Sequence, residues 1–254
     1  MKSTKLQFTN ANGEKLAARL DSPKDTDPKA YALFAHCFTC SKNLAAVGHI
    51  SRALTGAGYG VLRFDFTGLG ESEGQFGDTN FSSNLLDLEH AAQLLAETRQ
   101  APKLLIGHSL GGAAVLNAAG KLESIRAVAT IGAPAHPVHV KHLVQEQEEE
   151  IRDRGQATVC IGGRPFEIRE HFLDDLLAHD AARNIGRLGK ALLVCHAPFD
   201  QIVGIDNAAD IFQAAKHPKS FLSLDNADHL LSRAEDARYA GAMIASWAAR
   251  YTDD

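Results

Sequence analysis

The chain has little of what marks several large classes of protein. Among its 254 residues there are only four cysteines, two methionines and one tryptophan. Four cysteines in a chain this long do not make a disulfide framework, so reduced thiols in a cytoplasm are the simpler expectation. No run approaches 18 consecutive apolar residues, which argues against a transmembrane helix. The first residues lack the apolar core of a secretory signal, and none is expected.

An excess of positive charge is also missing. The 26 Lys and Arg residues against 31 Asp and Glu residues give a net charge of −5, with no basic stripe. We therefore expect neither nucleic acid nor a membrane surface as a partner. What remains is an ordinary globular composition, 45% hydrophobic and 22% charged, long enough to bury the core of one large α/β domain over residues 1–254.

Short apolar runs alternate with helical patterns along most of the chain. The opening predicts a hairpin that turns at Asn12-Gly13. The later predicted strands cover residues 30–38, 60–66, 103–109, 125–134, 190–198 and 220–229, and the predicted helices cover residues 45–60, 82–98, 110–122 and 235–251. Strands that alternate with helices predict a doubly wound, mostly parallel sheet, here of eight strands, covered by helices on both faces. The hairpin predicts an antiparallel edge.

Residues 135–186 break this alternation. They include the charged stretch "QEQEEEIRDR" and a second predicted hairpin around Gly162-Gly163. An interruption of this length between two sheet strands predicts a cap that is inserted within the single domain and lies over one end of the sheet. The charged stretch is most simply the solvated face of a cap helix.

The sharpest chemical signal is the run Gly107-His108-Ser109-Leu110-Gly111. Gly-x-Ser-x-Gly alone is weak, but here an apolar predicted strand leads into it and a small-residue helix leaves it. Strand, tight turn and helix are typical of a nucleophile elbow, which would expose Ser109 at the carboxyl end of the strand. The helix N-terminus would aim N–H groups at the reacting oxygen. The alternative is a plain turn with a solvated serine.

A nucleophilic serine needs a base, and the base needs an acid that orients it. In this architecture the chain order is serine, acid, histidine. Asp200 and His229 lie in the loops after two successive predicted strands, and we prefer them as acid and base. Four other residues compete for these roles, namely Asp206, Asp225 and Asp228 as the acid and His196 as the base. Asp206 is predicted to enter a helix, Asp225 to end a strand, and Asp228 to point away from the base. His196 is predicted to be a structural histidine.

These segments together resemble the α/β-hydrolase superfamily over essentially the whole chain. Beyond the elbow they include "HCF", "DFTGLGES", "DQIV" and a late Ala-Asp-His. More narrowly, "AHCFTCSKN", "NFSSN", "GGRPF" and "HPKSF" are similar to the hydrolase half of bacterial proteins in which this domain is fused to an OsmC-like domain. No OsmC-like domain is present in this sequence, so a standalone relative and a part of a longer protein are both open. Cinnamoyl and feruloyl esterases share the His-x-Phe-Thr loop.

The resemblance implies a serine hydrolase that cleaves carboxylic esters through an acyl-enzyme on Ser109. It places the oxyanion hole at the backbone N–H groups of Leu110 and Phe38, and it implies no metal and no organic cofactor. The implied partner is a small-molecule ester; an OsmC-like domain or protein and a homodimer stay open. A thioesterase or a peptidase with the same triad is the alternative. Asp-nucleophile hydrolases are disfavoured because position 109 is serine.

A function of another class is suggested by Cys37-x-x-Cys40, because a strand, CxxC and helix can form a thiol–disulfide site. The chain would then be a thiol-redox or non-catalytic module for an OsmC-type peroxidase. Such a site leaves Ser109 and His229 unexplained. We therefore expect both cysteines to line the ester pocket, and whether they pair stays open.

Several further residues are candidates for the substrate pocket: His108, His136, Arg164, Phe166 and Phe172. Phe166 and Phe172, with Leu176 and Leu177, either line it or anchor the cap to the sheet. His136, His139 and His142 recur every three residues, as metal ligands on a helix can. The intervening Pro137 and the lack of a nearby Cys or Asp cluster favour solvated residues, and no metal is expected.

The turn "TGLGESEG" lacks the third glycine of a dinucleotide-binding loop, because position 73 is Glu73. It also follows an internal strand and does not open the fold. We therefore expect no dinucleotide site.

Overall fold

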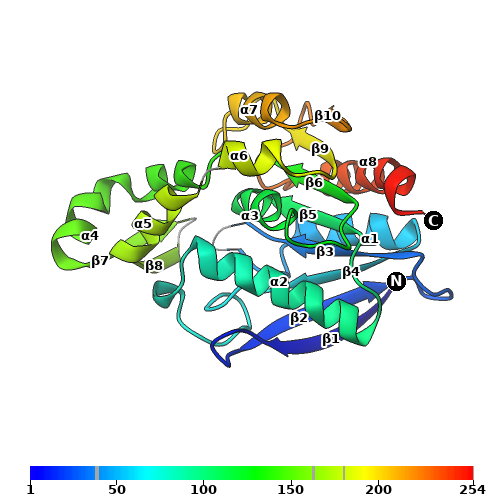
Figure 1. The fold of residues 1–254 in the computed structure, drawn as a ribbon, viewed down its shortest axis with the longest axis horizontal. Helices are drawn as coiled ribbons and strands as arrows, with labels where there is room; N and C mark the ends of the chain where they lie inside the picture. The colour runs from blue at the N-terminus through cyan, green and yellow to red at the C-terminus, as the bar shows by residue number, and fades with distance from the viewer. Residues whose placement is uncertain (38–39, 162–163, 180, 254) are drawn as a thin grey trace.

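The computed structural model describes residues 1–37, 40–161, 164–179 and 181–253, and Figure 1 shows its layers. The main sheet has eight strands in the order β1-β2-β4-β3-β5-β6-β9-β10. Their bounds are β1 Lys2–Thr9, β2 Lys15–Ser22, β3 Ala30–Ala35, β4 Tyr59–Phe64, β5 Leu104–His108, β6 Ala127–Ile131, β9 Ala191–His196 and β10 Lys219–Ser223. β1 pairs antiparallel with β2 and β2 antiparallel with β4, while the other pairs are parallel. The predicted mostly parallel eight-stranded sheet is confirmed.

Helices bury both faces of this sheet. One face is covered by α1 (Ala45–Gly56) and α8 (Ala234–Thr252). The other face is covered by α2 (Phe81–Thr98), α3 (Leu110–Ala118), α6 (Ala181–Gly186) and α7 (Asp206–Ala214). Along β3, Ala32 and Phe34 belong to the first core, whereas Leu33 and Ala35 belong to the second. Because side chains of a strand alternate between its faces, a strand buried on both sides is apolar throughout.

The first turn of α2 is fixed by a reciprocal cap. The side chain of Asn80 accepts a hydrogen bond from the N–H of Ser83, and the Ser83 hydroxyl accepts one from the N–H of Asn80. This pair satisfies two backbone donors that a helix end leaves free. The helix then runs over the range that the apolar period of the sequence predicts.

The chain between β6 and β9, residues 132–190, is here called the insertion, and most of it forms a separate lobe (Figure 1, left). The elements of the lobe are η2 Pro137–Gln147, α4 Glu148–Arg154, β7 Gln156–Ile161, β8 Arg164–Arg169 and α5 Glu170–Ala178, while α6, which ends the insertion, lies over the sheet beside α3 and α7. β7 pairs antiparallel with β8, as the second predicted hairpin requires. The turn at Gly162-Gly163 lies outside the described residues. The predicted cap, residues 135–186, falls within the insertion.

An aromatic cluster joins the insertion to the rest of the domain. The ring of Phe76, in the short helix η1 (Phe76–Asp78), lies 5.3 Å from the ring of Phe166 and 6.3 Å from that of Phe172. Both insertion phenylalanines are buried in the main core, and so is Leu176, while Leu177 is exposed. Asp175 of α5 also accepts hydrogen bonds from the N–H and hydroxyl of Ser82, at 2.7 and 2.6 Å.

None of the helices in the described ranges is both long and apolar enough to cross a bilayer.

Candidate active site

The tight turn predicted at Ser109 is present. Ser109 lies between the end of β5 and the start of α3 with φ 54° and ψ −125°, a conformation that non-glycine residues rarely adopt. A Cβ atom on Gly107 would collide with the backbone of Gly111, and one on Gly111 would collide with the carbonyl oxygens of Ala35 and His36. The two glycines therefore let helix and strands approach closely enough to lift the serine out of the sheet edge.

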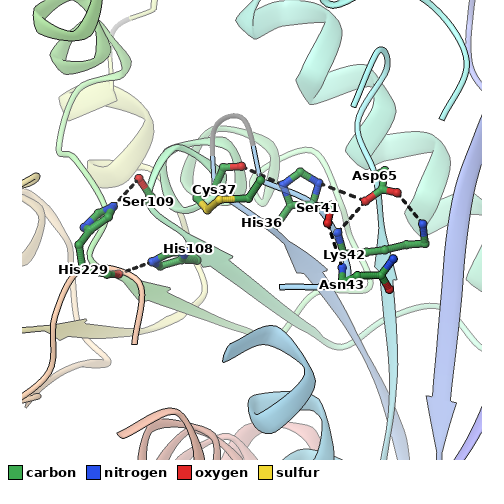
Figure 2. Close-up of a disulfide and its surroundings, with 10 residues drawn as sticks. His36, Cys37, Ser41, Lys42, Asn43, Asp65, His108, Ser109 and His229 are labelled. Atoms are coloured by element: carbon green, nitrogen blue, oxygen red, sulfur yellow. Dashed lines mark hydrogen bonds and ion pairs between the residues drawn. A yellow bond between two sulfur atoms is a disulfide. The ribbon is translucent and has the colours of Figure 1, made fainter. Parts of the chain in front are cut away.

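Asp200, His229 and Ser109 form one chain of hydrogen bonds. The Nε2 atom of His229 lies 3.0 Å from the Ser109 hydroxyl oxygen, and its Nδ1 atom lies 2.7 Å from an Asp200 carboxylate oxygen. Because a carboxylate only accepts, Nδ1–H is the donor and Nε2 is free to accept the serine proton. Figure 2 shows His229 reaching Ser109. The structure thus brings together the three residues that the sequence selects from three different loops.

The Asp200 carboxylate is held in its charged form. Burial opposes its charge, but the hydrogen bond from His229 and the N–H groups of Val203 and Ile202, 2.9 and 2.8 Å away, outweigh burial. Together they hold the pKa of Asp200 below its ordinary value. Asp200 therefore stays ionised beside the Nδ1–H of His229.

The competing acids and base are placed elsewhere. Asp206 opens α7 and is exposed, Asp225 is bonded to the Ser223 hydroxyl, and Asp228 caps the N–H of Ser232. His196 points at the carbonyl oxygen of Val203, 2.8 Å from its Nε2 atom. The geometry favours Asp200 and His229 over all four.

The loop after β3 departs from one expectation of the sequence. Cys37 and Cys40 form a disulfide, so the expectation of reduced thiols is wrong for this pair. The physical reason is the close approach of the two residues: the N–H of Cys40 donates to the carbonyl of Cys37 at 3.1 Å, and the two Cα atoms lie 5.4 Å apart, within disulfide range. The other two cysteines, Cys160 and Cys195, are free.

Of the two predicted oxyanion donors, one can be placed. Leu110 is buried at the first position of α3, so its N–H is among those that a helix leaves unpaired at its N-terminus. Phe38 lies outside the described residues.

A narrow cavity adjoins Leu110 and Cys37. Its walls are mostly apolar and aromatic, formed by Phe66, Leu69, Phe76, Phe81, Gly111 and Ala114 together with His36 and Asn84. Cys37 therefore lies in a cavity wall, as expected of a pocket residue. Phe166 and Phe172 pack against Phe76, which is one of the wall residues. Cys40 is half-buried, and His108 is buried beneath His229.

The two polar cap candidates lie at the surface of the insertion. His136 is exposed, and the Arg164 guanidinium is exposed over the ring of Phe166, 5.5 Å from its centre. Within the described ranges, no three His, Cys, Asp or Glu side chains gather as metal ligands. The side chain of His142 is not among those that the structure describes.

A buried ion pair that sequence analysis missed ties the loop after β3 to the loop after β4. The carboxylate of Asp65 accepts from the backbone N–H of Lys42 at 2.6 Å, from the Lys42 ammonium, and from the N–H of Glu71 at 2.9 Å. Asp65 and Lys42 are 0% and 1% exposed, and Figure 2 shows them side by side. Both residues lie in motifs on which the family resemblance rests, "DFTGLGES" and "SKN". That resemblance is the sequence signal that could have pointed to them.

Comparison with known proteins gives the same architecture. Residues 26–154 match a family model described as serine aminopeptidase, S33. The esterase domain of a Rhodothermus marinus protein is 53% identical, with 99% of this chain and 100% of that chain covered and a TM-score of 0.82. Est1E from Butyrivibrio proteoclasticus, solved with ferulic acid, is 19% identical over 94% of this chain and 97% of its own, at a TM-score of 0.80. Mouse alpha/beta hydrolase domain-containing protein 10 is also 19% identical, with 97% of this chain and 99% of that chain covered and a TM-score of 0.76. No curated protein sequence matches significantly.

Proposed function

Because the chain belongs to the serine aminopeptidase S33 family of α/β-hydrolases, we propose that it cleaves carboxylic esters through an acyl-enzyme on Ser109. The observation that carries the proposal is the unbroken hydrogen-bond chain from Asp200 through His229 to the Ser109 hydroxyl. The 53% identical Rhodothermus marinus chain is named as an esterase domain, which supports ester over amide substrates.

The hydrogen-bond geometry supports each proton transfer of the proposed reaction. As the Ser109 oxygen attacks the ester carbonyl, His229 Nε2 takes its proton, and Asp200 stabilises the resulting imidazolium through Nδ1–H. The imidazolium then protonates the departing alcohol. A water molecule attacks the acyl-enzyme with His229 again as base, and Ser109 is released.

The oxyanion is stabilised by backbone donors. The N–H of Leu110 lies at the start of α3, where the helix dipole also favours negative charge. The second proposed donor is the N–H of Phe38 in the loop after β3. The disulfide at Cys37 and Cys40 and the ion pair at Lys42 hold the described parts of that loop.

The decisive experiment compares hydrolysis of p-nitrophenyl acetate and butyrate by the wild type and Ser109→Ala. We expect the wild type to turn over and the variant to lose at least about 10³-fold in kcat, because the nucleophile is gone. Ser124→Ala is the control, since Ser124 precedes β6 at the opposite edge of the sheet, where its hydroxyl donates to the carbonyl of Pro102. Equal activity of the wild type and Ser109→Ala would rule out the mechanism.

The same triad would also serve a thioesterase or a peptidase. A panel of matched butyryl substrates, an oxygen ester, a thioester and a p-nitroanilide, separates these classes. We expect kcat/KM to be highest for the oxygen ester.

The Cys37–Cys40 disulfide favours a second candidate function of a different class. A thiol-redox module would accept two electrons and two protons from a partner dithiol, which would become a disulfide while Cys37 and Cys40 become thiols. An OsmC-type peroxidase is the partner that the sequence resemblance implies. Fluorophosphonate labelling separates the two candidates, because only an activated Ser109 is labelled. Thiol titration with and without a dithiol reductant tests the redox alternative.

A further inference from the structure

Three buried histidines outside the triad lie at the carboxyl ends of sheet strands. His36 directly follows β3, His108 is the last residue of β5, and His196 is the last residue of β9. Their exposed fractions are 1%, 2% and 0%. The proposed reaction uses none of them, and buried imidazoles are rarely retained without a hydrogen-bonding role.

Each of these rings contacts a backbone carbonyl oxygen in a loop that carries part of the site. His108 Nε2 lies 2.6 Å from the carbonyl of His229, the base itself. His196 Nε2 lies 2.8 Å from the carbonyl of Val203, whose N–H binds the Asp200 carboxylate. The third ring, that of His36, places Nδ1 2.8 Å from the carbonyl of Cys37 (Figure 2).

These contacts fix which nitrogen carries the proton. A carbonyl oxygen only accepts, so the nitrogen facing it must be the donor in each ring. Among the described residues, the other nitrogen of His36 and of His196 is buried without a hydrogen-bond partner, which suits a neutral ring and not a charged one. Carboxylates do lie near both rings, Asp65 at 3.8 Å from His36 Nε2 and Asp200 at 3.9 Å from His196 Nε2, but both distances are beyond hydrogen-bond range. Burial lowers the pKa of His36, and burial, with the neighbouring His229, lowers the pKa of His108 to about 4.

We propose that His36, His108 and His196 are positioning residues, each a neutral single donor that fixes the loop bearing one part of the catalytic site. The inference rests on the proposed serine-hydrolase function. A histidine suits this position because it reaches a carbonyl from a strand end without bringing a second charge under the imidazolium of His229, whose ring centre is 5.2 Å from that of His108. His108 fixes the base, His196 the acid loop, and His36 the loop after β3.

Amide substitutions test the proposal because they separate the two ring nitrogens. The side-chain nitrogen of glutamine falls near the place of histidine Nε2, and that of asparagine falls near the place of Nδ1. We therefore expect His108→Gln and His196→Gln to keep kcat within about fivefold, and the two Asn variants to lose about 10- to 100-fold with KM within about threefold. The pattern should reverse at His36, where Asn rescues and Gln does not.

His171→Leu is the matched control. His171 also contacts a backbone carbonyl, that of Thr79, at 3.2 Å, but in the insertion and away from the triad loops. Its loss should leave kcat unchanged. Equal kcat for Gln and Asn at all three strand-end positions, with both variants folded, would overturn the proposal.

A readout that needs no turnover separates this inference from the proposed function. The Nδ1–H proton of His229, bonded to Asp200, should give a downfield proton resonance in the wild type and in His108→Gln but not in His108→Asn. If that pattern holds while Ser109 supports no hydrolysis, the ester function fails and the positioning role stands. If hydrolysis depends on Ser109 but the resonance is the same in both amide variants, the positioning role fails.

Discussion

The carboxyl edge of the main sheet buries charged side chains, whereas the insertion exposes them. At the edge, Asp65, Lys42 and Asp200 are 0%, 1% and 7% exposed, and all three are paired. In the insertion, the side chain of Arg152 is 32% exposed, and its partners Glu170 and Asp174 are 46% and 61% exposed. The buried pairs fix the positions of the groups that they join, whereas the exposed pairs lie on a solvated surface.

This difference separates two demands on the fold. Burying an ion pair carries a large desolvation cost, which is tolerated only when every polar atom is satisfied, so a buried pair gives up stability for fixed geometry. Exposed pairs add little and constrain little. We infer that the reaction depends on the edge, and that the insertion is the part of the domain that can vary.

The largest effect is expected from Asp200→Asn. The amide oxygen can still accept from the N–H groups of Ile202 and Val203, but it cannot stabilise the imidazolium of His229, so we expect kcat to fall by about 10⁴-fold. Steady-state ester hydrolysis at neutral pH measures it. Asp206→Asn, which alters an exposed acid at the start of α7, is the control and should change kcat little. The reverse result would move the acid to Asp206.

A smaller effect is expected in the pH dependence of stability, through the buried Asp87 of α2. Its carboxylate accepts from the N–H and hydroxyl of Thr67, both at 2.9 Å. Burial raises its pKa to about 6, although the bonds from Thr67 offset part of the rise. Between about pH 4 and 6 the folded state therefore binds more protons than the unfolded state, and stability falls as pH rises, by up to about 3 kcal/mol.

Asp87→Asn should remove this fall, because the amide does not titrate. Urea unfolding at intervals between pH 4 and 7 measures the slope. The exposed Asp153 of the insertion gives the matched control, and Asp153→Asn should keep the wild-type slope. Parallel curves for wild type and Asp87→Asn would contradict the assignment.

The disulfide should contribute about 2 kcal/mol to the free energy of unfolding, because it closes a loop of only four residues. The free energy of unfolding of the double variant Cys37→Ser/Cys40→Ser, measured in denaturant, should be lower by that amount. A dithiol reductant should lower the free energy of unfolding of the wild type to the same value. Cys160→Ser, at an exposed free thiol of the insertion, should change nothing. A wild type whose stability is indifferent to the reductant would count against the bond.

The smallest effect is expected from Arg152→Ala in the insertion. The guanidinium contacts two partly exposed carboxylates, Glu170 at 3.1 Å and Asp174 at 2.6 Å, which should contribute at most about 1 kcal/mol. Denaturant unfolding and kcat should both stay close to the wild type. A loss above about 2 kcal/mol would mean that the insertion depends on its charges as the edge does.

Local patterns predicted much of this edge. The strand–turn–helix signal around Ser109 depends on neighbours in sequence, and it placed Ser109 at the end of β5. Chain order and strand ends were enough to select Asp200 and His229, because the carboxyl ends of parallel strands meet at one edge of a sheet. The alternation of strands and helices predicted the parallel sheet, because a helix that crosses over between two strands lets them run parallel.

The remaining contacts join residues far apart in sequence, or depend on backbone angles that no pattern specifies. Lys42 meets Asp65 only because β3 and β4 are neighbours in the sheet. His108 meets the carbonyl of His229 across 121 positions. The approach of Cys40 to Cys37 is permitted by the spacing of the two cysteines but is not required by it.

The contacts that Phe76 and Ser82 make with the insertion have a consequence for protein engineering. The insertion leaves the sheet after β6 and returns at β9, so a chimera could receive the lobe of another hydrolase between those two points. The graft would also have to carry partners for the Phe76 ring and for the Ser82 N–H and hydroxyl, now supplied by Phe166, Phe172 and Asp175. Phe76 and Ser82 would therefore be among the residues redesigned together with the transplanted lobe.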